Sequence, residues 1–173
     1  MKRPTASTLA EPSGDFLLRP FEGRDRAALE GLAREVVERG EMFAYESVAP
    51  VMDYWLGQGI QTWMVEGPDG RILGSYALKA NQPGRGSHVA NAGYMVHQGA
   101  RGRGIGRRMC EHSLELARSA GFQSMQFNMV ISTNEPAIRL WRDLGFQEVG
   151  RLPKVFRHAK LGLVDALVFY REL

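Results

Sequence analysis

The sequence contains one cysteine, Cys110, and no apolar run that approaches the ~18 residues needed to span a bilayer. A single cysteine excludes an internal disulfide and is typical of a reducing compartment, so we expect a cytoplasmic protein. No group of His, Cys, Asp and Glu residues has metal-ligand spacing, and no motif of a serine or cysteine nucleophile is present. These absences predict no bound metal, no membrane association and no covalent enzyme intermediate.

An excess of charge of one sign is also missing. The 22 basic and 19 acidic residues leave a net charge of +3, which is too small to indicate a nucleic-acid partner. Apolar residues make up 44% and charged residues 24% of the 173 residues, as in an ordinary folded domain. Residues 1–14 lack both hydrophobic periodicity and the apolar segment of a secretory signal. We therefore expect a flexible tail there and a single domain over residues 15–173.

The most informative stretch is V-H-Q-G-A-R-G-R-G-I-G-R-R, at residues 96–108. It follows a predicted strand, residues 88–96, and precedes a predicted helix, residues 105–120. Four glycines within eight residues permit tight turns and let a ligand approach the backbone N–H groups. The unpaired N–H groups at a helix start and the nearby arginines favour a negatively charged ligand. The pattern therefore predicts a pyrophosphate-binding loop.

The spacing of this loop excludes two common phosphate-binding motifs. A dinucleotide-binding G-x-G-x-x-G that begins at Gly102 would need a glycine at position 107, which is an arginine. A P-loop requires Lys and Ser or Thr after its last glycine, whereas two arginines follow Gly106. The pattern that fits is R-x-x-G-x-G, formed by Arg101, Gly104 and Gly106.

Hydrophobic periodicity predicts a mixed α/β fold. The expected strands are residues 16–20, 61–66, 71–79, 88–96, 124–130, 146–150 and 163–170, and the expected helices are residues 24–39, 50–56, 105–120 and 135–144. In the strand at 124–130, Met125, Phe127 and Met129 alternate with polar residues and are expected to share one face. The order of the elements predicts one mixed sheet of about seven strands with helices on both faces.

Two motifs resemble those of the GCN5-related N-acetyltransferases, the GNAT family. The first is the R-x-x-G-x-G loop after the fourth strand. The second is N-E-P-A-I-R-L-W-R-D-L-G-F at residues 134–146, which is similar to the family's N-x-x-A-x-x-L-Y-x-x-x-G-F. Together with the element order, the resemblance covers residues 15–173. It implies the GNAT fold with its fourth and fifth strands splayed, acetyl-CoA as cosubstrate, and direct transfer of acetyl to an amine in a ternary complex.

The resemblance also implies which residues bind acetyl-CoA. Backbone groups of Met95 and Val96 would pair with the pantetheine arm, N–H groups of the glycine-rich loop would bind the pyrophosphate, and Asn134 would lie near the pantetheine. The residues expected at the cofactor are Met95, Val96, Arg101, Gly102, Arg103, Gly104, Ile105, Gly106, Arg107, Asn134 and Trp141.

A narrower resemblance concerns the two strands expected to splay. H-V-A-N-A-G-Y at residues 88–94 and Q-F-N-M-V-I-S-T-N at residues 126–134 are similar to the fungal acetyltransferases that act on the proline analogue azetidine-2-carboxylate. In that group, asparagines on the splayed strands are implicated in handling the substrate and the thioester. Asn91 and Asn128 occupy the matching positions and are our candidate catalytic residues. Hydrogen-bonded core amides are the alternative interpretation of both.

One position departs from the family pattern. Where many relatives have a tyrosine that protonates the leaving thiolate, this sequence has Trp141, whose indole N–H donates a hydrogen bond but does not usefully release a proton. A thiolate is a tolerable leaving group at neutral pH, and a donor such as Asn128 or a backbone N–H can stabilise its charge. Tyr94 and Tyr76 are alternative acids.

The acceptor site is less well defined by the sequence. Phe43, Tyr45, Glu46 and His88 are expected to border the acceptor pocket, and Glu41, Glu46 and His88 are the candidate general bases. Each has an ordinary alternative, because aromatic side chains often pack on a sheet and charged ones are often simply solvated.

We therefore interpret the chain as an acetyl-CoA-dependent N-acetyltransferase that acts on a small-molecule or amino-acid-like amine. The alternatives are a protein or peptide N-terminal acetyltransferase, a non-catalytic acetyl-CoA sensor, and a nucleic-acid-binding protein that uses the arginine-rich loop. The family resemblance also implies a homodimer. The sequence identifies neither the acceptor, nor the general base, nor the group that replaces the usual tyrosine.

Overall fold

The structure, a computed structural model, describes residues 16–173, and the tail expected at residues 1–14 lies outside them. Within residues 16–173 the chain forms one seven-stranded sheet and four α-helices. The strands are β1 (Leu17–Pro20), β2 (Gln61–Glu66), β3 (Ile72–Ala80), β4 (Val89–Val96), β5 (Ser124–Ile131), β6 (Gln147–His158) and β7 (Gly162–Glu172). The helices are α1 (Arg26–Arg39), α2 (Val48–Leu56), α3 (Ile105–Ser119) and α4 (Glu135–Asp143). None of these helices is both long and apolar enough to cross a membrane.

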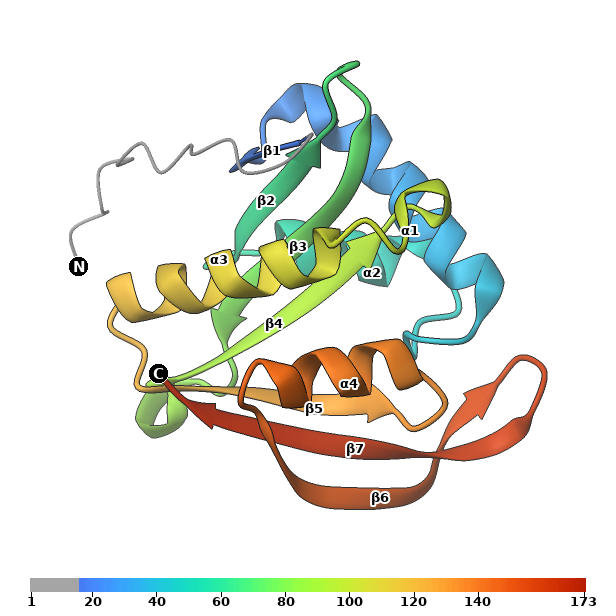
Figure 1. The fold of residues 1–173 in the computed structure, drawn as a ribbon, viewed down its shortest axis with the longest axis vertical. Coiled ribbons are helices and arrows are strands. Elements are labelled where there is room, and N and C mark those ends of the chain that lie inside the picture. Colours follow the sequence, from blue (N-terminus) through green and yellow to red (C-terminus); the bar gives the residue numbers. More distant parts are fainter. Residues whose placement is uncertain (1–15) are drawn as a thin grey trace.

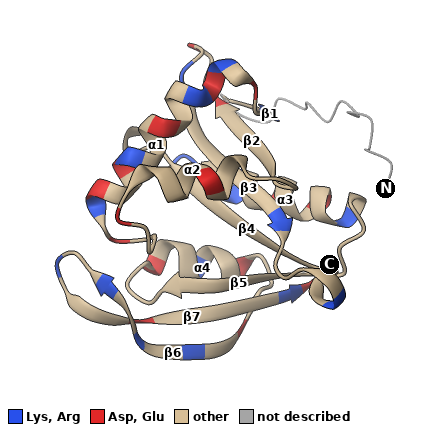
Figure 2. Cartoon of the chain, turned by 180° about the vertical axis from the view of Figure 1, so that it is seen from behind, with Lys and Arg blue, Asp and Glu red and all other residues tan. Residues whose placement is uncertain are grey.

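The sheet is mixed and has helices on both faces. Its strand order is β1-β2-β3-β4-β5-β7-β6, and every neighbouring pair is antiparallel except β4 and β5. Figure 1 shows α3 and α4 in front of the sheet, with α1 and α2 behind it. Figure 2, seen from behind, shows charges of both signs along α1, whereas β4 and β5 carry none. The predicted fold class is confirmed.

The sheet separates two hydrophobic layers. In front, Ile105 and Met109 of α3 pack with Trp141 of α4 against the sheet. Behind, Leu29 of α1 packs with Trp55 of α2 on the opposite face. Burial of this apolar surface, worth roughly 25 cal/mol per Å², holds both helix layers on the sheet.

The parallel pair β4 and β5 is joined at one end only. Val89 pairs with Ser124 and Ala90 with Met125, and these are the only pairs between the two strands in the described chain. Beyond them the strands diverge, while β3 stays paired with β4 along its length (Figure 1). The predicted splay of the fourth and fifth strands is confirmed, and it opens the sheet beyond Ala90.

A bulge interrupts β5 where regular alternation was predicted. Asn128 and Met129 together lie opposite a single residue of β7. Met129, expected on the same face as Phe127, is 40% exposed, whereas Phe127 is 5% exposed. The prediction for Met129 is wrong because the extra residue of a bulge breaks the two-residue period of the strand.

β6 and β7 form a long hairpin whose tip reaches the loop between α1 and α2. The Ala159 N–H donates to the Gly40 carbonyl oxygen at 3.0 Å, and Lys160 Nζ lies 2.8 Å from Glu41 Oε1. The strand predicted at residues 146–150 continues into this hairpin. Its full length was not predicted, because most residues of β6 are exposed and show no hydrophobic alternation.

Candidate active site

A cavity of about 800 Å³ extends from the start of α3, along the diverging strands β4 and β5, to the loop between α1 and α2. Its lining is mostly apolar, with a few amide and arginine side chains. The predicted site residues that line it are Phe43, Tyr45, Asn91, Val96, Arg101, Gly102, Gly104, Ile105, Gly106, Arg107, Asn128, Asn134 and Trp141.

Four predicted site residues and the candidate base Glu41 do not line the cavity, and Glu41 is described below with its ion pairs. The Met95 side chain is buried with α1 and α2, so only its backbone is left to face the gap beside β4. Arg103 is exposed in the glycine-rich loop, Glu46 is exposed before α2, and His88 is exposed before β4. Among residues 16–173, no Asp, Glu or His lines the cavity. No group of three or more His, Cys, Asp or Glu side chains in that range is arranged to hold a metal ion.

The glycine-rich loop turns into α3 through two left-handed glycines. Gly102 has φ +76° and Gly104, the N-cap of α3, has φ +77°. Ile105 and Gly106 follow in the first turn of the helix, where N–H groups have no helical acceptor. Gly104 and both of these residues line the cavity, so this end presents unpaired donors and the positive end of the helix dipole.

Two arginines add positive charge at the same end of the cavity. Arg107 also pairs with Asp143 of α4, with Nη2 and Oδ2 3.0 Å apart. Partial burial, and to a lesser extent the nearby Arg39, lower the pKa of Arg101, which still remains charged at neutral pH. Glycine N–H groups, a helix start and guanidinium groups together fit a diphosphate.

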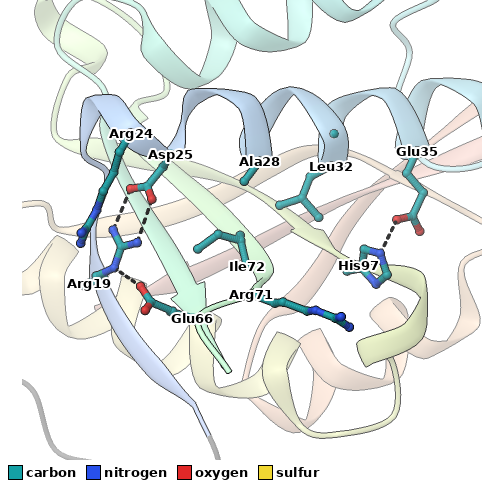
Figure 3. A pocket seen from close by; sticks show the side chains of 12 residues that line it. Arg19, Arg24, Asp25, Ala28, Leu32, Glu35, Glu66, Arg71, Ile72 and His97 are labelled. Carbon is teal, nitrogen blue, oxygen red and sulfur yellow. Dashed lines mark hydrogen bonds and ion pairs between the residues drawn. The ribbon is translucent and has the colours of Figure 1, made fainter. Parts of the chain in front are cut away.

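The loop is anchored from behind by α1. Glu35 Oε1 accepts a hydrogen bond from the Gln98 N–H at 2.7 Å, and its other carboxylate oxygen lies 3.8 Å from His97 Nε2 (Figure 3). His97 and Gln98 connect β4 to the glycine-rich loop, so their contacts with Glu35 of α1 fix the position at which the loop begins.

A second cavity, of about 650 Å³, lies between α1 and the β2–β3 turn. Figure 3 shows Arg19 inside it between Asp25 and Glu66, at 2.7 Å and 2.5 Å. Its other arginines, Arg24 and Arg71, also have carboxylate partners. Because its cations are paired, this cavity offers less free charge to an anion than the one at the glycine-rich loop, which we take as the site.

An amide network lies where β4 and β5 begin to diverge. Asn81 Oδ1 accepts hydrogen bonds from Asn91 Nδ2 at 3.1 Å and from Asn128 Nδ2 at 2.7 Å. Gln126 Nε2 donates to Asn128 Oδ1 at 2.8 Å. Asn81 therefore bridges the two strands and orients both candidate catalytic amides. The sequence did not point to Asn81, because it lies at the start of a predicted loop.

The two alternative tyrosine acids direct their hydroxyl groups into the core. The Tyr94 ring lines the cavity, but its hydroxyl oxygen lies 2.8 Å from Ser113 Oγ of α3. The Tyr76 hydroxyl is hydrogen-bonded to His112 Nδ1 at 2.6 Å. Burial raises the pKa of both well above the usual value for tyrosine. Tyr54 of α2 also lines the cavity, and burial raises its pKa to about 12, so it is protonated at neutral pH.

Trp141 forms an aromatic wall of the cavity. It is buried, and its ring centroid lies 5.2 Å from that of Tyr94 and 4.7 Å from that of Phe127. These contacts accommodate the bulk of the tryptophan side chain at this position.

Glu41, a candidate base from the sequence, is held in ion pairs. Its carboxylate lies 2.8 Å from Lys160 Nζ and 2.7 Å from Arg39 Nη2, and these two partners lower its pKa to about 2. So acidic a carboxylate is a poor proton acceptor, and Glu41 does not line the cavity. Its ion pair with Lys160 instead links the loop that carries Phe43 and Tyr45 to the tip of the β6–β7 hairpin, and its ion pair with Arg39 links the same loop to the end of α1.

Comparison with known proteins identifies relatives of this architecture. Residues 28–146 match the acetyltransferase (GNAT) family. The chain is 39% identical over 99 residues to N-acetyltransferase aca1 of Schizosaccharomyces pombe, a match that covers 57% of this chain and 47% of aca1. The chain thus spans about half the length of this curated relative.

Solved structures are similar over nearly the whole chain. A GCN5-related N-acetyltransferase from Kribbella flavida superposes with a TM-score of 0.86 at 37% identity, covering 92% of this chain and 98% of that one. A phosphinothricin acetyltransferase from Sinorhizobium meliloti, solved in complex with AcCoA, superposes with a TM-score of 0.81 at 21% identity, covering 92% and 89%. At that identity the second likeness shows the fold alone.

Proposed function

The chain belongs to the GNAT family of acetyl-CoA-dependent N-acetyltransferases, and from this premise we propose that it acetylates the amine of a small-molecule or amino-acid-like acceptor. The observation that carries the proposal is one cavity that joins an anion-binding loop to an amide-lined end between diverging strands. The acetyl donor and the amine can therefore meet inside a single space.

We propose that the donor, acetyl-CoA, lies along the cavity with its pyrophosphate at the glycine-rich loop and its thioester toward the amide network. Its pyrophosphate is placed at the glycine-rich loop, where Gly102, Gly104 and the first turn of α3 present free N–H groups. We assign its pantetheine arm to the gap between β4 and β5, whose facing edges have no strand partner beyond Ala90 among residues 16–173. Amide groups of the arm can pair there with backbone groups, including those of Met95 and Val96. The thioester then lies near the amide network.

In the reaction a neutral amine nitrogen attacks the thioester carbonyl carbon. A C–N bond forms, the C–S bond breaks, the nitrogen gives up one proton, and coenzyme A leaves as a thiolate that takes up a proton. Asn128 uses its Nδ2 group to reach Asn81, and its second N–H can stabilise the developing negative charge. The side-chain oxygen of Asn91, Oδ1, receives no hydrogen bond from residues 16–173 and can accept an N–H of the incoming amine.

Proton removal does not require a side chain of the cavity in this proposal. Since no carboxylate or imidazole of the described chain lines the cavity, the acceptor reacts from its neutral form and releases its proton to water. Tyr54, which is protonated at neutral pH, is a donor available on the acceptor side.

The boundary of the acceptor end supports a small acceptor. The loop of residues 41–47 carries Met42, Phe43 and Tyr45 into the cavity lining. Hydrogen bonds and ion pairs to the β6–β7 hairpin tip hold this loop in place. A peptide substrate would need an extended groove, whereas this loop places bulky side chains along one side of the cavity.

A second candidate is a non-catalytic acetyl-CoA sensor. It is favoured by Trp141 at the position of the usual acid and by the lack of a base in the described lining of the cavity. It would bind acetyl-CoA without turning it over.

We test the function by calorimetric titration with acetyl-CoA, followed by a thiol-release screen of amines, amino acids and short peptides on the same sample. Binding with release of coenzyme A for a small amine supports the proposal. Release only with peptides favours an N-terminal acetyltransferase, and binding without release favours the sensor. A protein that does not bind acetyl-CoA overturns the proposal.

Assembly and location are also proposals. Apolar residues of the β6–β7 hairpin, among them Val149, Leu161 and Leu163, are exposed, and a second copy of the chain can cover them. Light scattering that gives the mass of a monomer would overturn the homodimer. Cys110 is free and buried, which supports a reducing, cytoplasmic setting.

A further inference from the structure

Lys79 is a partly buried cation that lacks a carboxylate partner. It lies near the end of β3, and none of the ion pairs formed within residues 16–173 includes it. Its Nζ lies 4.1 Å from the centroid of the Tyr54 ring. A cation–π contact of this kind is weak and leaves the positive charge of the ammonium group without a counter-charge. Lys79 is therefore placed to bind a further negative charge.

The position of Lys79 puts this charge beside the acceptor end of the cavity. Lys79 pairs directly with Asn91 across the β3–β4 ladder, so both side chains project from the same face of the sheet. Asn91 and Tyr54 both line the cavity. On the same face, a Cβ at Gly93 would lie 3.2 Å from the Tyr54 ring, so Tyr54 packs directly over β4. Lys79 thus contacts one residue of the cavity lining, Tyr54, and lies beside a second, Asn91, in the strand ladder.

The charge of the cavity favours the same kind of ligand. No Asp or Glu of the described chain lines it, and its own cations, Arg101 and Arg107, lie at the diphosphate end. An acceptor with several positive charges, such as a polyamine, would find no counter-charge in this lining. Lys79 is not itself part of the cavity lining, but it is the cation in contact with Tyr54, which lines the acceptor end, so an acceptor carboxylate beside Tyr54 could reach it.

We propose that Lys79 is a specificity-determining residue that binds a carboxylate of the acceptor, so that the acceptor is an amino acid rather than a simple amine. The inference rests on the proposed N-acetyltransferase function and deepens it. The carboxylate of the acceptor pairs with the Lys79 ammonium beside the Tyr54 ring. The neutral amine of the same molecule then reaches the side-chain oxygen of Asn91 and the thioester.

The test compares matched acceptors with matched variants. Standard amino acids are each assayed beside their carboxamides, which keep the amine but lose the negative charge, using thiol release by the wild type, Lys79→Met and Lys79→Arg. Because the amine of a carboxamide is less basic, kcat/KM is expressed per neutral amine. On that scale the wild type should prefer the acid over the amide by about tenfold or more, the size expected for one partly buried ion pair. Lys79→Met should lose this preference mainly through KM, and Lys79→Arg should keep most of it.

Separate readouts distinguish the possible failures. Acetyl-CoA affinity and melting temperature should be unchanged in both variants, which identifies any loss caused by misfolding. A wild type that prefers carboxamides, or a Lys79→Met variant that keeps the acid preference, overturns the inference while leaving the acetyltransferase intact. If no acceptor is turned over, the proposed function fails. Calorimetric titration of the coenzyme A complex with the amino acids then tests whether Lys79 binds their carboxylate. Equal amino-acid affinity in the wild type and in Lys79→Met would overturn the proposed role of Lys79 as well.

Discussion

At the scale of single residues, Gly104 carries the greatest conformational demand of the site. Its φ of +77° is strained for any residue with a Cβ, and most strained for a β-branched one. Gly104→Val should therefore displace the first turn of α3 and weaken acetyl-CoA binding by about tenfold or more, while the fold persists. Calorimetric titration measures the affinity, and circular dichroism verifies the fold.

Gly121, just after the other end of α3, supplies the matched control. It has φ +86°, and a Cβ there would meet nothing within 4 Å. Gly121→Val should lower the melting temperature through the same kind of strain without changing the affinity for acetyl-CoA. If Gly104→Val binds acetyl-CoA as tightly as the wild type, the glycine-rich loop is not the pyrophosphate site.

The amide network gives a second prediction at this scale. Asn128→Ala removes the donor that faces the proposed thioester and should lower kcat by about tenfold or more, with little change in acetyl-CoA affinity. Asn81→Ala should act in the same direction, because it releases both Asn91 and Asn128 from their bridge. Steady-state kinetics separates kcat from KM. Unchanged turnover in Asn128→Ala would remove that residue from the mechanism.

The residues of the site differ in how far a sequence can reveal them. Gly102 and Gly104 were predictable because a phosphate-binding loop needs its glycines at fixed local spacing. Asn91 and Asn128 stood out as amides within apolar strands. Nothing in the sequence around Asn81 or Lys79 indicates a site. Only the pairing of β3 with β4 and the divergence of β4 from β5 bring these two residues near Asn91. Trp141 was expected at the site, but its stacking against Phe127 depends on the fold.

At the scale of secondary-structure elements, the tip of the β6–β7 hairpin contacts the segment that carries the 41–47 loop, which we propose borders the acceptor. Lys160→Ala removes the ion pair with Glu41 and should loosen the loop that carries Phe43 and Tyr45. We expect the acceptor KM to rise several-fold, on the order of 3- to 10-fold, with unchanged acetyl-CoA affinity. Kinetics at saturating acetyl-CoA provides the measurement.

The same hairpin offers a matched control for this change. Arg151 pairs with Asp165 across the hairpin, away from its tip, at 3.1 Å. Arg151→Ala removes an exposed ion pair of similar size and should leave the acceptor KM unchanged. Equal effects of Arg151→Ala and Lys160→Ala would show that the contact at the tip has no special role.

Elements were predicted well where their residues have one buried face. The amphipathic α1 and its end at Gly40, with φ +57°, follow directly from local pattern. The bulge at Asn128 and Met129 and the extension of β6 did not follow. A bulge depends on the register with a distant strand, and an exposed strand lacks the alternation on which the prediction relies.

At the scale of the whole molecule, the ion pairs of Glu41 link stability to pH. Its pKa falls from 4.5 to about 2 on folding, because Lys160 and Arg39 favour the ionised form. The depressed pKa means that the stabilisation is present above pH 4.5 and is lost as the pH falls toward 2. The melting temperature of Glu41→Gln should therefore lie below that of the wild type at pH 6.

The difference in melting temperature between the wild type and Glu41→Gln should shrink as the pH is lowered from 4.5 toward 2. Asp25 and Asp165 also have lowered pKa values, but they are common to both proteins, so the comparison isolates Glu41. Melting curves recorded from pH 2 to pH 6 give the result. A constant difference across the whole range would mean that the charge of Glu41 does not contribute to stability.

The two pairs that join β4 to β5 have a consequence for the motions of the whole chain. In the part of the chain that the structure describes, the sheet consists of a four-stranded part and a three-stranded part, and direct strand pairing connects them only at Val89 and Ala90. A donor bound along the gap would act as an additional strand between the two parts. We expect backbone amides on the facing edges, residues 91–96 and 126–131, to exchange their hydrogens quickly in the free protein and slowly once acetyl-CoA is bound. Such protection would mean that the bound cosubstrate completes the sheet and couples the backbones of its two parts, which already share one hydrophobic core.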